Sequence, residues 1–321
     1  MENQQTFSSS YIGNKLGSVR VMFYNIYGYM WYPDKENSPH LSSGPKLLRQ
    51  SMETELIVAY APDVVGFQEY SPDFHKNMTP KLMAAGYSEV DAYHTEPHKD
   101  GTHLNYTPLF YRADTMRLID KGFVMYPLTS PEIVGEDGQE LNINDVKSKS
   151  LTWAVFEEIA SGKRFIAVCT HYMYSAHYLS PEQKIAARLI DAQILLDTVN
   201  EIRGRSEYLG LPVIMGGDLN SRIGEACNEL MLKNGMEWLQ NTAKLTDNTN
   251  GIKKYATYDA NAGEYITCPT PSADATGAID HIFVLRDDAE KCVINAYFAV
   301  TDKNALLSSD HCPRITDITL N

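Results

Sequence analysis

The chain has 321 residues, of which 43% are apolar, and its 28 Lys plus Arg against 41 Asp plus Glu give a formal net charge of −13. This length and apolar content allow a substantial core, either in two domains or in one large α/β or sandwich unit. The acidic balance repels a polyanion at long range and offers no basic surface, which disfavours long duplex nucleic acid as a substrate.

Membrane and export signals are missing from the sequence. No apolar run approaches the ~18 residues that cross a bilayer, so no membrane span is expected. Residues 1–5 lack the basic flank and apolar stretch of a secretory signal, which favours a cytoplasmic protein, although a removed signal would leave the same beginning. The odd number of cysteines and the lack of a Cys-x-x-Cys pair argue against a disulfide framework. We expect buried free thiols at Cys169, Cys227, Cys268, Cys292 and Cys312.

The predicted elements alternate between strands and helices along the chain. Segments rich in Val, Ile, Phe and Tyr predict buried strands. These lie at residues 19–24, 64–68, 107–112, 151–159, 164–170, 211–215, 279–285 and 292–300. Helical patterns lie between them at residues 46–60, 73–85, 181–203 and 221–234. A mixed sheet system flanked by helices follows.

Capping and turn residues indicate where some of these elements begin and end. Ser180 is a predicted N-cap, with Pro181 at the first helical position and Gln183 completing a capping box. Residues 130–150 are polar and contain glycine, which predicts an excursion between strands. Because no linker, repeat or low-complexity block demands a boundary, we expect an N-terminal extension at 1–17 and a single domain at 18–321.

Polar residues recur where apolar strand-like runs end. Each alone has a structural explanation: Asn25 would start a turn, Glu69 would cap the next segment, and His171 would be a hydrogen-bonded histidine beneath the surface. Together, carboxylate, carboxamide and imidazole groups at strand ends are what a hard cation and an attacking water need. The pattern predicts a metal-assisted hydrolase that uses Asn25, Glu69, His171, Asp218, Asn220, Asp280, Asp310 and His311.

Taken in order, these segments resemble the endonuclease/exonuclease/phosphatase superfamily, which includes DNase I-like nucleases, abasic-site endonucleases, inositol polyphosphate phosphatases and neutral sphingomyelinases. The resemblance covers nearly the whole chain and is specific as a set. It rests on residues 21–25, the Gln-Glu pair in 64–69, residues 170–171, the Gly-Asp-x-Asn motif in 216–220, residues 279–283 and the Ser-Asp-His motif in 308–311. It implies an α/β four-layer sandwich, in which two mixed sheets pack face to face between helices and the active site lies at one rim.

The resemblance also implies a divalent metal ion. Glu69 is the expected principal ligand of one or two Mg²⁺ or Mn²⁺ ions, which prefer oxygen donors. Asn25 would be a neutral ligand or an orienting group beside it. Asp310 would add a carboxylate, either as a direct ligand or through a ligand that it orients.

The remaining positions take catalytic roles by the same resemblance. Asp218 would orient and deprotonate the attacking water, and Asn220 would hydrogen-bond a phosphate oxygen without adding charge. His311 would donate to the phosphate while Asp280 holds its other ring nitrogen and favours the imidazolium. His171 would be a second phosphate donor or a leaving-group acid.

Three further features concern the rim of the site. His281 alternates to the opposite face of its strand from Asp280, so we interpret it as structural or at the rim. Two aromatic clusters follow Asn25 and His171 and would either stack on a base, sugar or lipid headgroup or pack two loops together. They are Tyr27, Tyr29, Trp31 and Tyr32, and Tyr172, Tyr174, His177 and Tyr178.

The leading hypothesis is a Mg²⁺- or Mn²⁺-dependent phosphoesterase that hydrolyses a phosphodiester in a small or exposed substrate, and acts as a monomer. A nuclease is the nearest alternative, but nucleases add basic loops, whereas Lys35, Lys46 and Arg49 are scattered here. A phosphomonoesterase acting on inositol or sugar phosphates is the third hypothesis. A non-catalytic binding module is the fourth, although every catalytic position carries a competent residue.

Overall fold

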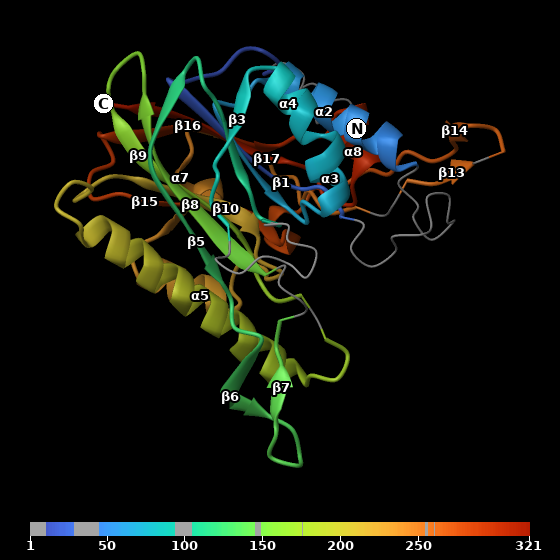
Figure 1. Ribbon diagram of the computed structural model, residues 1–321, viewed down its shortest axis with the longest axis vertical. Coiled ribbons are helices and arrows are strands. Elements are labelled where there is room, and N and C mark those ends of the chain that lie inside the picture. The colour runs from blue at the N-terminus through green and yellow to red at the C-terminus, as the bar shows by residue number, and fades with distance from the viewer. Residues whose placement is uncertain are drawn as a thin grey trace.

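Two mixed β-sheets packed face to face form the centre of the molecule (Figure 1). The computed structural model describes residues 11–28, 45–93, 105–144, 149–174, 176–253, 256–259 and 261–321. The seven-stranded sheet has the order β12 (Leu245–Thr246), β16 (Cys292–Ala299), β17 (Arg314–Leu320), β1 (Val19–Asn25), β2 (Val64–Gln68), β4 (Leu109–Arg112) and β3 (Tyr87–Glu89). The six-stranded sheet has the order β11 (Glu237–Trp238), β15 (Asp280–Leu285), β10 (Val213–Asp218), β9 (Arg164–His171), β8 (Ser150–Glu158) and β5 (Met116–Met125).

Helices cover the outer face of each sheet. One apolar core fills the space between the sheets, and two others lie between each sheet and its helices. The seven-stranded sheet carries α2 (Lys46–Tyr60), α3 (Pro72–Asn77), α4 (Thr79–Ala84) and α8 (Lys303–Ser308), and the six-stranded sheet carries α5 (Pro181–Gly204) and α6 (Ala226–Lys233). The predicted four-layer α/β sandwich is therefore confirmed.

Smaller elements lie outside these layers. The hairpin of β6 (Thr129–Val134) and β7 (Glu140–Asn142) projects beyond the sandwich (Figure 1) and occupies the predicted excursion. A second hairpin joins β13 (Tyr258–Asp259) and β14 (Glu264–Tyr265). The remaining elements are α7 (Leu239–Thr242) and a 3₁₀ turn at Ala275–Gly277.

Most predicted strands and helices are present, with shifted ends and some errors. The predicted helix at 73–85 is two helices, because Pro80 lies in the first turn of α4 and cannot continue α3. The helix predicted from 221 begins only at Ala226. Two long strands were not predicted: β5 is a half-buried edge strand with charged residues, and β17 contains the buried Asp317, which pairs with Arg20. Burial in both strands is decided by partners distant in sequence.

The sheets approach closely where β1 and β10 cross. A Cβ atom on Gly216 would lie 2.4 Å from the Phe23 ring of the opposite sheet, so only glycine fits there. This contact sits two residues before Asp218 and two before Asn25. It brings the ends of the two strands, one from each sheet, to the same place.

Four of the five cysteines are buried. Cys169, Cys227, Cys292 and Cys312 are buried free thiols as expected, but Cys268 is exposed, because it lies in an irregular segment after β14.

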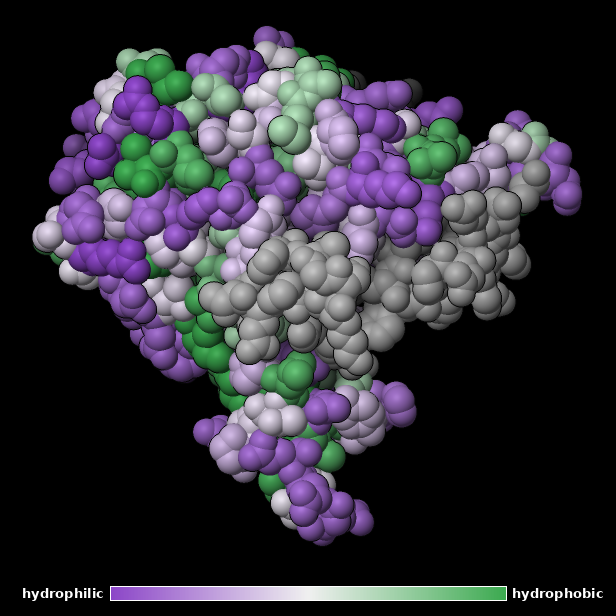
Figure 2. Space-filling model, in the orientation of Figure 1, coloured by the Kyte–Doolittle hydropathy of each residue, from purple (hydrophilic) through white to green (hydrophobic). Residues whose placement is uncertain are grey.

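Outside the grey area, the face in Figure 2 is mainly hydrophilic, with apolar residues in separate patches. Among the described residues, no helix combines the length and apolar character needed to cross a bilayer.

Candidate active site

Parallel strand pairs in both sheets end at one rim of the sandwich. In the seven-stranded sheet, β1 runs parallel to β2 and Asn25 lies opposite Gln68, so Glu69 follows directly. In the six-stranded sheet, β9 runs parallel to β10 and His171 lies opposite Asp218. The carboxyl ends of parallel strands meet at one edge of a sheet, which is why these residues converge.

Antiparallel neighbours bring the remaining residues to the same rim. Asp280 begins β15 and lies opposite Asp218. Strand β17 runs antiparallel to β1, so the segment before it reaches the end of β1. There Ser309 Oγ donates to the Asn25 carbonyl at 2.7 Å and accepts from His311 N at 3.1 Å.

Asp218 Oδ2 is the atom on which the site converges. Asn25 Nδ2 donates to it at 2.9 Å, His171 Nε2 lies at 3.4 Å and His311 Nε2 at 4.0 Å. Burial alone would raise the pKa of Asp218, but the positive charges of His311 and Lys149 lower it below its usual value. Asp218 is therefore a carboxylate at neutral pH.

Glu69 lies on the other side of Asn25. Its Oε1 accepts from Asn25 Nδ2 at 3.3 Å, and its Oε2 accepts from Gly28 N at 2.8 Å. The backbone of Glu69 has φ +62°, a left-handed conformation that costs about 1–3 kcal/mol in a non-glycine residue and clusters at functional sites.

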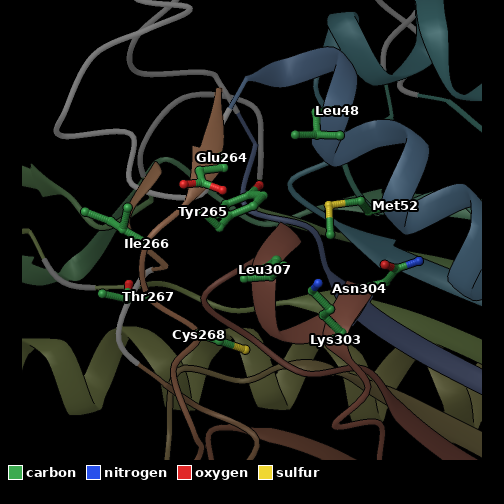
Figure 3. Close-up of a pocket in the computed structure, with 10 residues that line it drawn as sticks. All are labelled: Leu48, Met52, Glu264, Tyr265, Ile266, Thr267, Cys268, Lys303, Asn304 and Leu307. Atoms are coloured by element: carbon green, nitrogen blue, oxygen red, sulfur yellow. The ribbon is translucent and has the colours of Figure 1, made fainter. Parts of the chain in front are cut away.

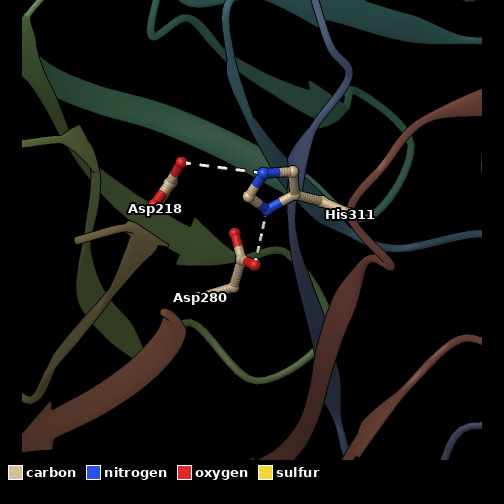
Figure 4. A group of neighbouring side chains, drawn as sticks. All are labelled: Asp218, Asp280 and His311. Atoms are coloured by element: carbon tan, nitrogen blue, oxygen red, sulfur yellow. Dashed lines mark hydrogen bonds and ion pairs between the residues drawn. The ribbon is translucent and has the colours of Figure 1, made fainter. Parts of the chain in front are cut away.

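His311 and Asp280 form a charged pair. His311 Nδ1 lies 2.7 Å from Asp280 Oδ2, and its Nε2 faces Asp218 (Figure 4). Burial would lower the pKa of His311, but Asp280, Asp310 and Asp218 together raise it well above its usual value. Asp218, Asp280 and His311 place ligand atoms within 4.8 Å of one another, yet an imidazolium has no lone pair for a metal ion.

His171 has a neighbour that the sequence analysis did not select. Lys149 Nζ lies 2.5 Å from His171 Nε2, closer than Asp218 does. Burial, followed by the charge of Lys149, lowers the pKa of His171, so the ring is neutral at pH 7. An ammonium group only donates, so His171 Nε2 is the acceptor in this contact.

Asn220, Asp310 and His281 complete the predicted set. Asn220 N donates to Asp218 Oδ1 at 2.9 Å, and its amide nitrogen donates to the Tyr172 carbonyl at 3.0 Å, which leaves its second amide hydrogen for a ligand. Asp310 Oδ1 lies 3.8 Å from His311 Nε2. His281 is fully buried and contacts the Ser221 carbonyl at 2.9 Å, so it lies within the structure and away from the rim.

The aromatic clusters divide between core and surface. Tyr172 is fully buried in the core under α5, and Tyr27 packs against the core under α2. Tyr174 and Tyr178 are 64% and 46% exposed. Tyr27 and Tyr172 pack on different cores, so this pair does not pack the two loops together. Among the described members, the exposed Tyr174, His177 and Tyr178 are accessible for stacking on a ligand. Tyr29, Trp31, Tyr32 and Lys35 lie outside the described residues.

Two residues of the site, Lys149 and Ser309, were given no role from the sequence. Lys149 precedes a strand at the end of a polar excursion, where nothing local marks it. Ser309 belongs to the Ser-Asp-His motif, so the motif could have indicated that this serine has a role in the site. Its hydroxyl joins the Asn25 carbonyl to His311 N.

A separate cavity of about 610 Å³ lies between α2, α8 and the segment after β14 (Figure 3). Its walls include Met52, Leu307 and Ile266, with Glu264 and Lys303 among the polar groups. None of the predicted site residues lines it. The chemistry-bearing residues therefore occupy a different part of the molecule.

Comparison with known proteins places the fold. No family model and no curated protein matches the sequence. An endonuclease/exonuclease/phosphatase from Bacteroides vulgatus is similar in structure, with TM-score 0.64, 24% identity, and coverage of 94% of this chain and 99% of that one. The mannosyl-6-phosphatase of Bacteroides thetaiotaomicron has TM-score 0.63 and 17% identity, over 94% and 99% of the two chains. The human Nocturnin catalytic domain has TM-score 0.63 and 16% identity, over 96% of each.

Proposed function

From the endonuclease/exonuclease/phosphatase fold of this chain, we propose that it is a divalent-metal-dependent phosphoesterase that hydrolyses a phosphodiester by attack of an activated water on phosphorus. One observation carries this proposal. Asn25, His171 and His311, from separate parts of the chain, surround a single oxygen of the buried Asp218. Asp218 as a base, His311 as a cationic donor and Asn25 as a neutral amide thus lie next to one another, as phosphoryl transfer requires.

The donor set around Glu69 fits Mg²⁺ or Mn²⁺. Glu69 and Asp310 would supply carboxylate oxygens, and the Asn25 amide donates to Glu69 and holds it in place. The carboxylates of Glu69, Asp218, Asp280 and Asp310 exceed the positive charge of His311 and Lys149, so a bound cation would offset the difference. When bound, the ion would neutralise charge on a phosphoryl oxygen and stabilise the leaving oxygen.

Asp218 is the proposed base. Its pKa is held low, so it is ionised over the working pH range, and it would accept a proton from the attacking water as the new P–O bond forms. The bond from phosphorus to the leaving oxygen breaks in the same displacement. His311, held as an imidazolium by Asp280, would donate to a non-bridging oxygen and stabilise the charge that develops there.

Lys149 is the proposed donor on the His171 side of the site. Because His171 Nε2 accepts from Lys149, this nitrogen has no hydrogen to give to a phosphate. We therefore assign the second donor role to Lys149, which has three ammonium hydrogens, and a positioning role to His171. The free amide hydrogen of Asn220 would bind a further phosphate oxygen.

The substrate is proposed to be small or exposed, because the net charge of −13 opposes the approach of a long polyanion. The mannosyl-6-phosphatase among the similar structures keeps a sugar phosphomonoester as the second candidate. A nuclease acting on single strands is the third.

An assay panel tests these proposals. The purified protein would be incubated with bis-p-nitrophenyl phosphate, p-nitrophenyl phosphate, mannose 6-phosphate, inositol phosphates, sphingomyelin, and single-stranded and duplex DNA and RNA. Each reaction would be run with EDTA, Mg²⁺ or Mn²⁺. We expect metal-dependent release of nitrophenol from the diester. Turnover that persists in EDTA would refute the metal requirement, and turnover of monoesters alone would refute the diester assignment.

A further inference from the structure

Arg49 is a buried arginine on α2, and its guanidinium binds backbone carbonyls behind the candidate active site. Its Nη2 donates to the carbonyls of Ile26 and Tyr27 at 2.6 and 2.8 Å, and its Nε donates to the carbonyl of Ser308 at 2.5 Å. The residue is 0% exposed. One side chain therefore joins the segment after β1 to the segment that carries the Ser-Asp-His motif.

The peptide groups that Arg49 binds are the same groups that hold the proposed metal ligands. In a trans peptide the C=O and the following N–H share one plane and point in opposite directions. The peptide of the Ile26 carbonyl ends in Tyr27 N, which donates to Asn25 Oδ1 at 3.0 Å. The peptide of the Tyr27 carbonyl ends in Gly28 N, which donates to Glu69 Oε2 at 2.8 Å. Rotation of either plane would break both of its hydrogen bonds.

The backbone at this position is strained and crowded. Tyr27 has φ +54°, which a side chain other than glycine adopts only when its surroundings hold it there. Arg49 binds the carbonyls on both sides of this residue, and its guanidinium lies 5.2 Å from the Tyr27 ring centroid. A Cβ atom on Gly28 would lie 2.2 Å from the Glu69 carbonyl, so this turn packs directly on the backbone of the metal-ligand candidate.

Two other buried groups support the same contacts. Glu53, one turn after Arg49 on α2, places Oε1 3.6 Å from Arg49 Nη2 and is 0% exposed. Lys253 Nζ donates to the Ser309 carbonyl. Ser309 Oγ in turn donates to the Asn25 carbonyl. Buried Arg49 and Lys253 thus bind backbone carbonyls in the segment after β1 and in the segment that carries the Ser-Asp-His motif.

We propose that Arg49 is a positioning residue that fixes Asn25 and Glu69 for metal binding by orienting the two peptide groups after β1. Arg49 touches neither substrate nor metal, and it acts through the N–H groups of Tyr27 and Gly28. The proposal rests on the proposed function, because it assumes that Glu69 binds a divalent ion.

Arg20 provides a matched control for the loss of a buried arginine. It lies on β1, the strand that ends at Asn25, and is 1% exposed. Its guanidinium binds Asp317 at 2.7 and 2.8 Å and the Tyr60 carbonyl at 2.9 Å. It precedes Asn25 by five residues, at the opposite end of the strand. Replacement of Arg20 therefore removes a buried guanidinium whose hydrogen-bond partners among the described residues do not include the peptide groups of Tyr27 and Gly28.

The experiment compares Arg49→Met, Arg49→Lys and Arg20→Met with the parent protein. Mn²⁺ affinity would be measured by isothermal titration calorimetry, backbone protection by hydrogen exchange with mass spectrometry, and stability by thermal unfolding. We expect Arg49→Met to weaken Mn²⁺ binding at least tenfold and to speed amide exchange in residues 26–28. Arg49→Lys keeps the charge but loses the planar guanidinium fork. Its Mn²⁺ affinity and amide exchange should therefore lie between those of the parent and those of Arg49→Met. Arg20→Met should lower the melting temperature and leave Mn²⁺ affinity and this exchange unchanged.

Other outcomes would overturn the proposal. The proposal fails if Arg49→Met keeps the parent's Mn²⁺ affinity and the parent's amide exchange at residues 26–28. It also fails if Arg20→Met changes both quantities as much as Arg49→Met does. If Arg49→Met does not fold, parental Mn²⁺ affinity in Arg49→Lys would overturn it. If the parent itself does not bind Mn²⁺, the metal-dependent function fails, and the exchange comparison alone then decides whether Arg49 orients these peptide groups.

Discussion

Replacement of Asp218 by Asn tests the centre of the proposed mechanism. The substitution keeps the size of the side chain and removes its charge and basicity. General base catalysis contributes on the order of 10²–10⁴-fold to a rate. At about 1.4 kcal/mol per tenfold, this corresponds to roughly 3–5 kcal/mol of transition-state stabilisation. We expect kcat for bis-p-nitrophenyl phosphate to fall by about this factor, while KM changes little because the phosphate donors remain.

The contacts of Asp218 set the accompanying loss of stability. Its two oxygens accept from Asn25 Nδ2 and Asn220 N, both at 2.9 Å. A carboxamide keeps one acceptor and turns its NH₂ group toward the other donor, which leaves a buried donor unsatisfied at a cost of about 1–3 kcal/mol. Because native domains have about 5–15 kcal/mol of stability, we expect the variant to remain folded at 25 °C.

Initial rates at saturating Mn²⁺, together with thermal unfolding, separate the two effects. The control is Asp197→Asn on the exposed side of α5, which makes the same chemical change outside the site. Turnover of Asp218→Asn within tenfold of the parent, in a protein that binds Mn²⁺ normally, would refute the assignment of Asp218 as base.

Three further predictions concern charge. Asp280→Asn removes the carboxylate that raises the pKa of His311, so the alkaline limb of the pH profile of kcat/KM should move to lower pH; an unmoved limb would contradict the pairing. Lys149→Met should raise KM for the diester at least tenfold and let the pKa of His171 rise, as NMR titration would detect; an unchanged KM would remove Lys149 from the phosphate site. Burial raises the pKa of Asp191 to about 7, so the folded state binds the extra proton and the parent loses stability as pH rises from about 4 to 7. Urea unfolding of Asp191→Asn at pH 5 and 8 should lack that loss, and an equal loss in both proteins would contradict it.

The structure brings the polar residues of the site together at the ends of strands, each of which has a local sequence pattern: Asn25, His171 and Asp218 end strands, and Asp280 begins one. Apolar runs such as 64–68 and 213–218 form strands that can be recognised residue by residue. The ends of parallel neighbours in a sheet then lie together by geometry alone. Their roles in catalysis stay predictions for the experiments above.

Contacts between residues distant in sequence could not be predicted from the sequence. Asn25 meets Asp218 across 193 residues, and Arg49 meets Ser308 across 259 residues. Lys149 showed the same limit, since no local pattern indicates that its ammonium group reaches His171. The positioning role that we propose for His171, in place of the expected donor role, rests on this neighbour.

The sequence by itself determined the alternation of strands and helices and which acids, amides and histidines stand at strand ends, because hydrophobic periodicity and chain order act over a few residues. The tertiary structure alone decided which atom faces which: His311 paired with Asp280, His171 as an acceptor, and Arg49 behind the turn after β1. Hydrogen bonds depend on distances of tenths of an ångström and on burial, and the packing of two sheets and their helices sets both.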